Sequence, residues 1–119
     1  MDELDPVFVA VAAYFSVLSE PTRLRIMHAI CETEKPVSQI VEEVDSTQTN
    51  VSRHLGLMYR AGVLSRRKVA SRVYYRISDK SMIEICRTVC NRIAGQMDEK
   101  KPMRRELLRL LPTAKSRAA

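Results

Sequence analysis

Side chains that can hydrogen-bond to bases and phosphates are concentrated between Thr47 and Arg72. The first group is spaced like the polar side of one helix and contains Thr47, Gln48, Thr49, Asn50, Ser52, Arg53 and His54. Amide and guanidinium groups make bidentate contacts with base edges, and hydroxyls suit phosphates or either base. The second group is cationic and follows in a β-rich segment: Arg66, Arg67, Lys68 and Arg72. We expect these four to contact phosphates, and Arg72, near a hairpin tip, to be able to enter the minor groove.

The residues of the first group differ in how directly they should face DNA. Thr47 is placed to cap the helix, so that the helix dipole and the free N–H groups face a phosphate. Asn50 and His54 flank the base-facing side and can reach the DNA backbone. The base-facing positions themselves are Gln48, Thr49, Ser52 and Arg53. The alternative is an ordinary polar helix surface, and His54 could instead pack at the turn.

Charge is distributed unevenly along the 119 residues, whose formal net charge is +6. Residues 1–45 carry nine acids and three bases, whereas residues 46–76 carry seven bases and no acid. Residues 77–119 carry ten bases and five acids. A domain polarised in this way presents one face to DNA phosphates and another to solvent or to itself. A winged-helix module that binds proteins has no need of an acid-free segment, so the charge pattern favours double-stranded DNA over that alternative.

Length and composition limit the other functional classes. A chain of this size has a modest core and no room for a large enzyme cleft. The sequence places no general base at a suitable spacing from a nucleophile and contains no carboxylate pair of the catalytic kind. Its three glycines form no phosphate-binding loop. We therefore expect no catalytic residue, no cofactor and no enzymatic activity. The apolar run from Val7 to Leu18 is short and follows acids, so we expect neither a secretory signal nor membrane association, and a cytoplasmic location.

Hydrophobic periodicity predicts a mostly α fold with one small β-hairpin. Residues 63–78 form the only β-rich segment, with a turn near Val69-Ala70-Ser71. Four helices should precede it: one capped by Asp5 before Pro6, one from Ser19-Glu20-Pro21 to about Cys31, one over 37–44, and one from about 48 to 61 that ends at Gly62. A long helix capped by Ser78-Asp79 should follow it. The order of elements predicts a winged helix-turn-helix with about five core helices and a two-stranded wing.

Residues 1–100 are expected to form the DNA-binding and dimerisation domain. Residues 101–119 form a basic extension, with a short helix after Pro102 and disorder from residue 113. The long helix carries apolar residues at spacings of three and four: Met82, Ile83, Cys86, Val89, Cys90, Ile93 and Met97. Such a seam suits another helix, and together with Val7, Val11 and Tyr14 it predicts a homodimer.

Four motifs, in this order, resemble the ArsR/SmtB family of bacterial winged-helix repressors. They are Leu18-Ser-Glu-Pro-Thr-Arg-Leu-Arg-Ile, Val51-Ser-Arg-His-Leu, Ala61-Gly-Val-Leu, and the segment from Arg66-Arg to Val73-Tyr-Tyr-Arg-Ile. The resemblance covers roughly residues 8–97. It implies a homodimer joined through its first and fifth helices, which binds an inverted-repeat operator and is released by an inducer.

The resemblance does not specify the inducer. Many members of the family bind metals through Cys or His in the third helix, or through Asp and His in the fifth. The chain has no Cys or His in residues 37–44 and no His in the fifth helix, so no nitrogen-rich metal site is expected. Relatives that respond to sulfide and persulfide pair a cysteine of the second helix with one late in the fifth, and those positions hold His28 and Ala94 here.

Cys31, Cys86 and Cys90 remain as candidate thiol sensors. An odd number of cysteines at wide spacing does not make a disulfide framework. Cys31 lies three residues after His28, and Cys90 lies four before Ala94, so antiparallel helices would bring Cys31 towards Cys90. Oxidants or reactive sulfur species could then form a disulfide or polysulfide bridge. Three thiolates could instead hold a soft metalloid such as arsenite, or all three could be small core residues.

Overall fold

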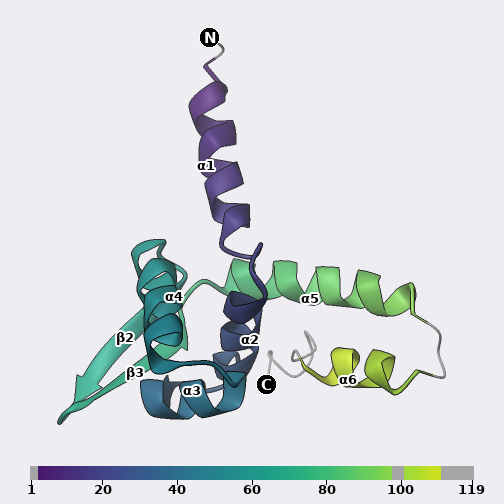
Figure 1. Cartoon of the computed structure of the whole chain (residues 1–119). Coiled ribbons are helices and arrows are strands. Elements are labelled where there is room, and N and C mark those ends of the chain that lie inside the picture. Colours follow the sequence, from purple (N-terminus) through teal and green to yellow (C-terminus); the bar gives the residue numbers. More distant parts are fainter. Residues whose placement is uncertain (1–2, 98–100, 111–119) are drawn as a thin grey trace.

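The computed structural model of the chain describes residues 3–97 and 101–110. In chain order the elements are α1 (Asp5–Ser16), α2 (Pro21–Ile30), β1 (Lys35–Pro36), α3 (Val37–Val44), α4 (Gln48–Arg60), β2 (Leu64–Val69), β3 (Arg72–Ile77), α5 (Lys80–Gly95) and α6 (Pro102–Leu110). Helices α2, α3 and α4 pack together with the sheet into a unit that we call the head. Helix α1, which we call the arm, projects away from the head, and α5 leaves it in another direction (Figure 1). The disorder expected from residue 113 lies outside the described residues.

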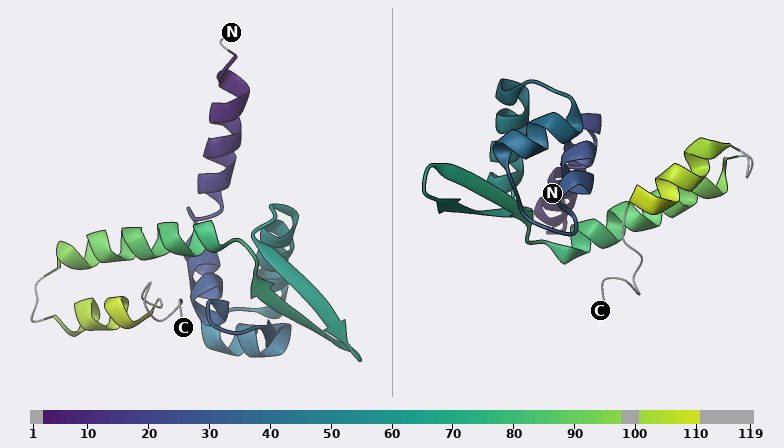
Figure 2. Two further views of the ribbon diagram at one scale, coloured as in Figure 1. Left: turned by 180° about the vertical axis from the view of Figure 1, so that it is seen from behind. Right: turned by 90° about the horizontal axis from the view of Figure 1, so that it is seen from below.

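The β2–β3 hairpin, which we call the wing, extends from the head on the side away from α5 and α6 (Figure 2). Its register pairs Leu64 with Ile77 at the base and Val69 with Arg72 at the tip, as the hairpin prediction required. Ala70 turns the chain there with φ of 54°. The two residues of β1 add a third antiparallel strand beside β3, and the sequence did not predict them.

Side chains cap three helix starts by accepting hydrogen bonds from backbone N–H groups. Asn50 N donates to Thr47 Oγ1 at 3.1 Å and Arg23 N donates to Glu20 Oε2 at 3.0 Å. Ser81 N donates to Asp79 Oδ1 at 3.0 Å. The caps predicted at Thr47 and Asp79 are therefore confirmed.

The cap predicted at Asp5 is wrong. Leu4 is the N-cap of α1, with helical φ and ψ and no side-chain cap hydrogen bond. Because the backbone is already helical at Leu4, Asp5 falls inside the first turn, where its charge favours the helix dipole without capping it. Gly62 does occupy the left-handed conformation after α4, with φ of 82°.

The core of the head is formed by apolar residues from every helix of the head, from the sheet and from the start of α5. The largest fully buried side chains are Ile26, Met27, Ile30, Ile40, Val51, Leu55, Met58, Val63 and Met82. This core fixes α4 against α2 and α3, so that the opposite side of α4 faces outward.

The predicted apolar seam of α5 lies on one side of the helix but is divided along its length. Met82 and Cys86 are buried in the core, whereas Val89 is 52% exposed and Ile93 is 43% exposed. The arm contains no buried residue, and its Val11 is 45% exposed. Apolar surface on α1 and α5 is thus left uncovered within one protomer.

The arm is attached to the head and to α5 near its C-terminal end. Tyr14 Oη donates a hydrogen bond to Asp79 Oδ2 at 2.7 Å, which links the arm to the N-terminus of α5. Burial, reinforced by the hydrogen bond to Asp79, raises the pKa of Tyr14 to about 12. Val17, directly after the arm, is buried in the core.

Among the described residues, no single helix has the length and apolar character needed to cross a membrane. Only α1 and α2 taken together meet those criteria, and they are bent by 73° relative to each other.

Candidate nucleic-acid interface

The outward side of α4 carries the four residues expected to face bases. Gln48, Thr49, Ser52 and Arg53 are all exposed, whereas Val51 and Leu55 on the opposite side are fully buried. Amphipathic packing therefore presents amide, hydroxyl and guanidinium groups on one side of a single helix. A helix with such a side has the dimensions and donors needed in the major groove.

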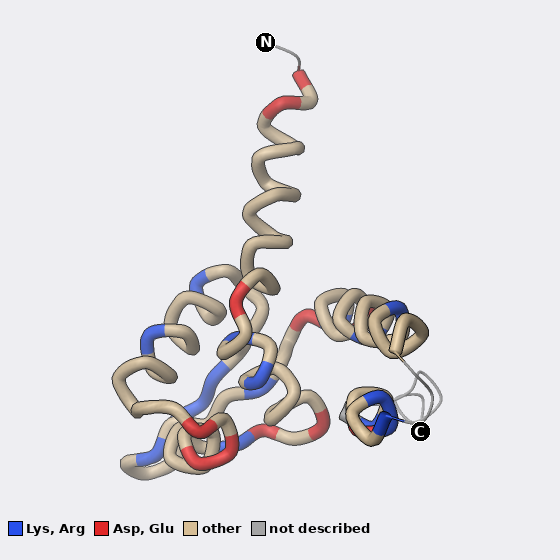
Figure 3. The backbone as a smooth tube through the Cα atoms, turned by 45° about the vertical axis from the view of Figure 1, so that its right-hand side comes forward, with Lys and Arg blue, Asp and Glu red and all other residues tan. Residues whose placement is uncertain are grey.

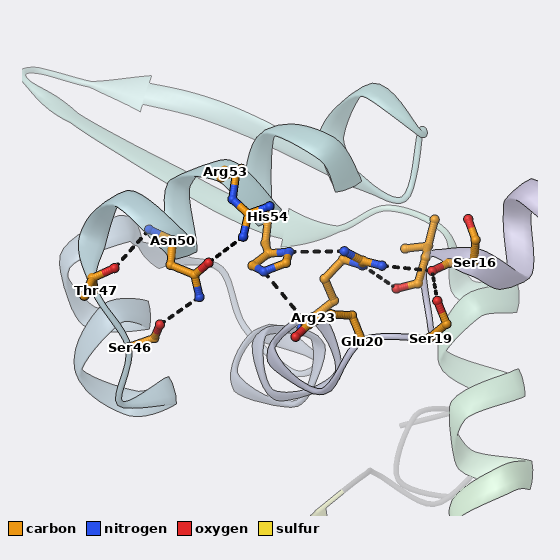
Figure 4. Close-up of polar contacts among 10 residues, drawn as sticks. Ser16, Ser19, Glu20, Arg23, Ser46, Thr47, Asn50, Arg53 and His54 are labelled. Atoms are coloured by element: carbon orange, nitrogen blue, oxygen red, sulfur yellow. Dashed lines mark hydrogen bonds and ion pairs between the residues drawn. The ribbon is translucent and has the colours of Figure 1, made fainter.

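Asn50 organises the N-terminal turn of α4 and is only half-buried. Its Nδ2 donates to Ser46 Oγ at 3.0 Å, and its Oδ1 accepts from Arg53 Nη2 at 2.7 Å (Figure 4). Thr47, although it is the cap, remains exposed. Asn50 therefore orients the Arg53 guanidinium, an arrangement that sequence spacing alone did not predict.

His54 lies inside the head, which corrects the expectation that it reaches DNA. Its relative exposure is 4%, and its ring contacts Arg23 of α2 and Glu20, the N-cap of α2. The spacing contains the reason: His54 follows Val51 by three residues and precedes Met58 by four, so it belongs to the apolar side of α4. Burial lowers the pKa of His54. The positive charges of Arg53 and Arg23 lower it further, whereas the negative charge of Glu20 acts in the opposite direction.

The cationic side chains of the wing are exposed, but they differ in the contacts that they make within the protein. Arg66 lies over the Tyr59 ring, 4.0 Å from its centroid, and donates to Tyr75 Oη at 3.4 Å. Lys68 has no acidic partner among the described residues. Arg66 is therefore held in place by neutral aromatic groups and keeps its charge, and neither Arg66 nor Lys68 is paired with an acid in the described part of the chain, so both can meet phosphates.

Arg67 forms an ion pair with Glu34, which lies just before β1. Its Nε donates to both carboxylate oxygens at 2.9 Å. The hydrogen bond lowers the pKa of Glu34 and raises that of Arg67. The Arg67 charge is thus partly neutralised by an acid that lies far away in the sequence.

Arg72, at the start of β3, is closer to the helices than its place near the wing tip suggested. Its Nη2 donates to Ser38 Oγ of α3 at 3.3 Å, and its guanidinium carbon lies 5.7 Å from the Tyr74 ring centroid. The Arg72 side chain therefore extends from the tip of the wing back to α3.

A groove of about 610 Å³ separates α4 from the wing. Its polar and aromatic lining includes Ser52, Tyr59, Arg66, Arg67 and Lys68. Ser52 also borders a neighbouring groove lined by Gln48 and Arg72. Figure 3 shows basic residues along α4 and the wing, and acids gathered around α3. The outward side of α4 and the cationic wing therefore form one continuous surface suited to a polyanion.

The three cysteines do not lie in one cluster. Cys86 and Cys90 line an apolar cavity of about 220 Å³ between α2, α5 and α6, whereas Cys31 borders a different pocket. All three are free thiols, and Cys31 Sγ donates to the His28 carbonyl oxygen at 3.3 Å. Burial raises the pKa of Cys86 to about 11 and also raises that of Cys90. Among the described residues, no group of three or more Cys, His, Asp or Glu could hold a metal ion.

Comparison of the sequence with known proteins identifies a family and a relative. The family model for bacterial regulatory proteins of the arsR family matches residues 20–66. The HTH-type transcriptional regulator MJ1325 of Methanocaldococcus jannaschii is 32% identical over 79 residues, which cover 66% of this chain and 89% of that protein.

Two solved structures show the same fold. The crystal structure of NolR from Sinorhizobium fredii matches with a TM-score of 0.72 at 24% identity, over 76% of this chain and 91% of NolR. The homodimeric winged helix-turn-helix DNA-binding domain Mb0332 from Mycobacterium bovis matches with a TM-score of 0.69 at 19% identity, over 85% of this chain and 97% of that one.

Proposed function

Because the chain belongs to the arsR family of bacterial regulatory proteins, we propose that it is a homodimeric repressor that reads an inverted-repeat operator. Regulators of this family bind DNA and are not enzymes. The observation that carries the proposal is the continuous surface formed by the outward side of α4 and the cationic wing. Each protomer would place α4 in the major groove of one half-site and its wing along the neighbouring backbone.

The roles of individual residues follow from their exposure and contacts. Arg53 and Gln48 are the candidates for base recognition, because both are exposed on α4 and carry bidentate groups. Arg66 and Lys68 are the candidates for phosphate contacts, and the Arg72 side chain extends from the tip of the wing to α3. Thr47, Thr49 and Ser52 offer hydroxyls along the same surface.

The uncovered apolar surface on α1 and α5 supports dimerisation. Val89 and Ile93 lie one turn apart on α5, and the arm has no buried residue. Pairing with a second copy would remove both surfaces from water. A two-fold dimer would also set two α4 helices about one turn of DNA apart, roughly 34 Å.

Selection of binding sites from random DNA tests the proposal. The wild-type protein should enrich an inverted repeat, and its affinity should fall steeply as salt rises. Arg53→Ala should relax selectivity at particular base pairs, because it removes a base contact. Arg25→Ala changes an exposed residue of α2; it is the matched control and should leave the selected sequence unchanged. Enrichment of no sequence, or the same relaxation in the control, would refute the assignment.

For the inducer we propose thiol chemistry at Cys86 and Cys90. These two thiols share one cavity, whereas Cys31 borders another, so the pair on α5 replaces the Cys31–Cys90 pair as the first choice. Bridging two thiols releases two protons and two electrons to an oxidant such as a persulfide. The arsenite alternative loses support, because the three thiols do not gather within a protomer.

Mass spectrometry and operator binding, measured together after persulfide treatment, test the inducer proposal. Modification of Cys86 or Cys90 should accompany loss of operator binding, and Cys90→Ser should abolish both effects. Cys31→Ser is the matched control and should respond like wild type. If Cys31→Ser alone abolishes the response, or if the Cys90→Ser protein responds normally, the pair on α5 is not the sensor.

A further inference from the structure

Arg23 of α2 joins the arm to the reading helix α4 through three polar contacts. Its Nε donates to the Val17 carbonyl oxygen at 2.8 Å, and its Nη2 donates to the Ser16 carbonyl oxygen at 2.9 Å. Its Nη1 lies 3.2 Å from Nδ1 of His54. Figure 4 shows the guanidinium between the end of the arm and the His54 ring. One planar group thus contacts the last turn of α1, the residue after it, and the middle of α4.

The contact with Arg23 determines which nitrogen of His54 carries the proton. A guanidinium can only donate, so Nδ1 must accept and the neutral ring carries its proton on Nε2. Nε2 lies 3.6 Å from Glu20 Oε2, the same oxygen that caps α2 through Arg23 N. Both ring nitrogens of His54 therefore have a partner at the start of α2. Along α4, His54 lies between Arg53, which is exposed on the outward side, and Leu55, which is buried in the core.

We propose that Arg23 and His54 are positioning residues that couple the orientation of the arm to the orientation of α4 on DNA. The inference rests on the proposed function, in which the arm contributes to the dimer and α4 reads the operator. Neither side chain needs to touch DNA. Their effect would pass through Arg53, which adjoins His54 and is oriented by Asn50.

The construction of the arm explains why such a link is needed. The arm has no buried residue, so within one protomer its direction depends on contacts at its C-terminal end. The guanidinium donates charge-assisted hydrogen bonds to two carbonyl oxygens at that end, those of Ser16 and Val17. The Ser16 oxygen also accepts from Ser19 N at 3.1 Å and from Ser19 Oγ at 2.7 Å, so the Arg23 contact adds to the local cap of the helix end. A lysine would keep the charge but could not span two carbonyls and an imidazole with one rigid group.

Protonation of His54 should open the link. Once Nδ1 carries a proton, it faces the Arg23 donor and the contact turns repulsive. The charged groups around His54 are Arg23 from α2, Glu20 at the N-cap of α2, and Arg53 from α4 itself. Because burial lowers the pKa of His54 below its ordinary value, the link is intact at neutral pH and opens on acidification.

The test compares Arg23→Gln and Arg23→Lys with Arg25→Gln, an equally charged neighbour on α2 that is exposed. Binding to the selected operator and to random DNA is titrated, while sedimentation and circular dichroism report the dimer and the fold. Both Arg23 variants should lose about tenfold or more in specific affinity, the size of one charge-assisted hydrogen bond, with random-DNA binding close to that of Arg25→Gln. Specific affinities for the Arg23 variants within twofold of the control would overturn the proposal.

A pH profile separates positioning from a merely structural role. The wild-type ratio of specific to random-DNA affinity should fall as pH drops through the pKa of His54, which NMR measures on the ring. His54→Asn places an amide oxygen near the Nδ1 acceptor position without titrating, so it should keep specific binding and lose the acid step. An acid step that persists in His54→Asn would overturn the proposal even if the Arg23 variants failed to fold. If the wild-type protein selects no operator, the proposed function fails. If the wild type selects an operator and the Arg23 variants bind it as well as the control does, only the coupling is refuted.

Discussion

Val89→Ala should weaken the dimer by an amount that follows from the exposure of Val89 in one protomer. Replacing valine by alanine removes two methyl groups, worth about 0.8 kcal/mol each when buried. Since Val89 is 52% exposed within the protomer, about half of that value is gained on dimerisation. A two-fold interface contains the position twice, so the expected loss is about 1.6 kcal/mol, or roughly a 15-fold higher dissociation constant.

Sedimentation velocity over a dilution series measures that constant. The matched control is Val69→Ala at the end of β2, the same chemical change at a residue that is 42% exposed. Val69 lies on the wing, away from α1 and α5, so its substitution should leave the dimer unchanged. An unchanged dissociation constant for Val89→Ala, or an equal weakening by Val69→Ala, would refute the assignment of this side of α5 to the dimer interface.

Three further predictions concern the charges and the thiols. Glu34→Gln should free Arg67 from its ion pair, raise affinity for random DNA and steepen the salt dependence by about one ion per protomer; an unchanged salt slope would contradict a role for Arg67 at phosphates. Arg72→Ala should weaken binding to all sequences about equally, which a selection experiment can check, since a change confined to particular base pairs would indicate base recognition instead. Alkylation of Cys86 by iodoacetamide should be slow at neutral pH, and its rate should rise with pH up to about 11, because burial raises the pKa of Cys86 and only the thiolate reacts. Peptide mass spectrometry measures the labelling, and fast labelling near pH 7.5 would show that the thiol is not buried as described.

Local chemistry predicted most of the helices and the wing. Thr47 and Asp79 have side chains that cap helices, and Gly62 accepts the left-handed conformation after α4, so these boundaries could be placed from residue types. Strand β1 could not, because two residues have no periodicity, and their pairing with β3 depends on a fold that is already formed.

The candidate site was predictable where it depends on one helix and not where it depends on packing between elements. The outward positions of α4 follow from its apolar stripe, and the same stripe, applied to His54, would have placed that ring in the core. The ion pair of Arg67 with Glu34 and the stacking of Arg66 on Tyr59 join distant segments and leave no local pattern. The division of the α5 seam into a buried first part and an exposed later part likewise depends on how far the helix extends beyond the head.

Photo-crosslinking from α4 tests the central claim most directly. A photoreactive amino acid in place of Ser52, on the outward side of α4, should crosslink the selected operator at two positions related by its two-fold symmetry and about one helical turn apart. The same group in place of Leu108, which is 39% exposed on α6, should give no such pair. Crosslinks from Ser52 that are absent or scattered along the DNA, or equal crosslinking from Leu108, would contradict the account of α4 as the reading helix of a homodimer.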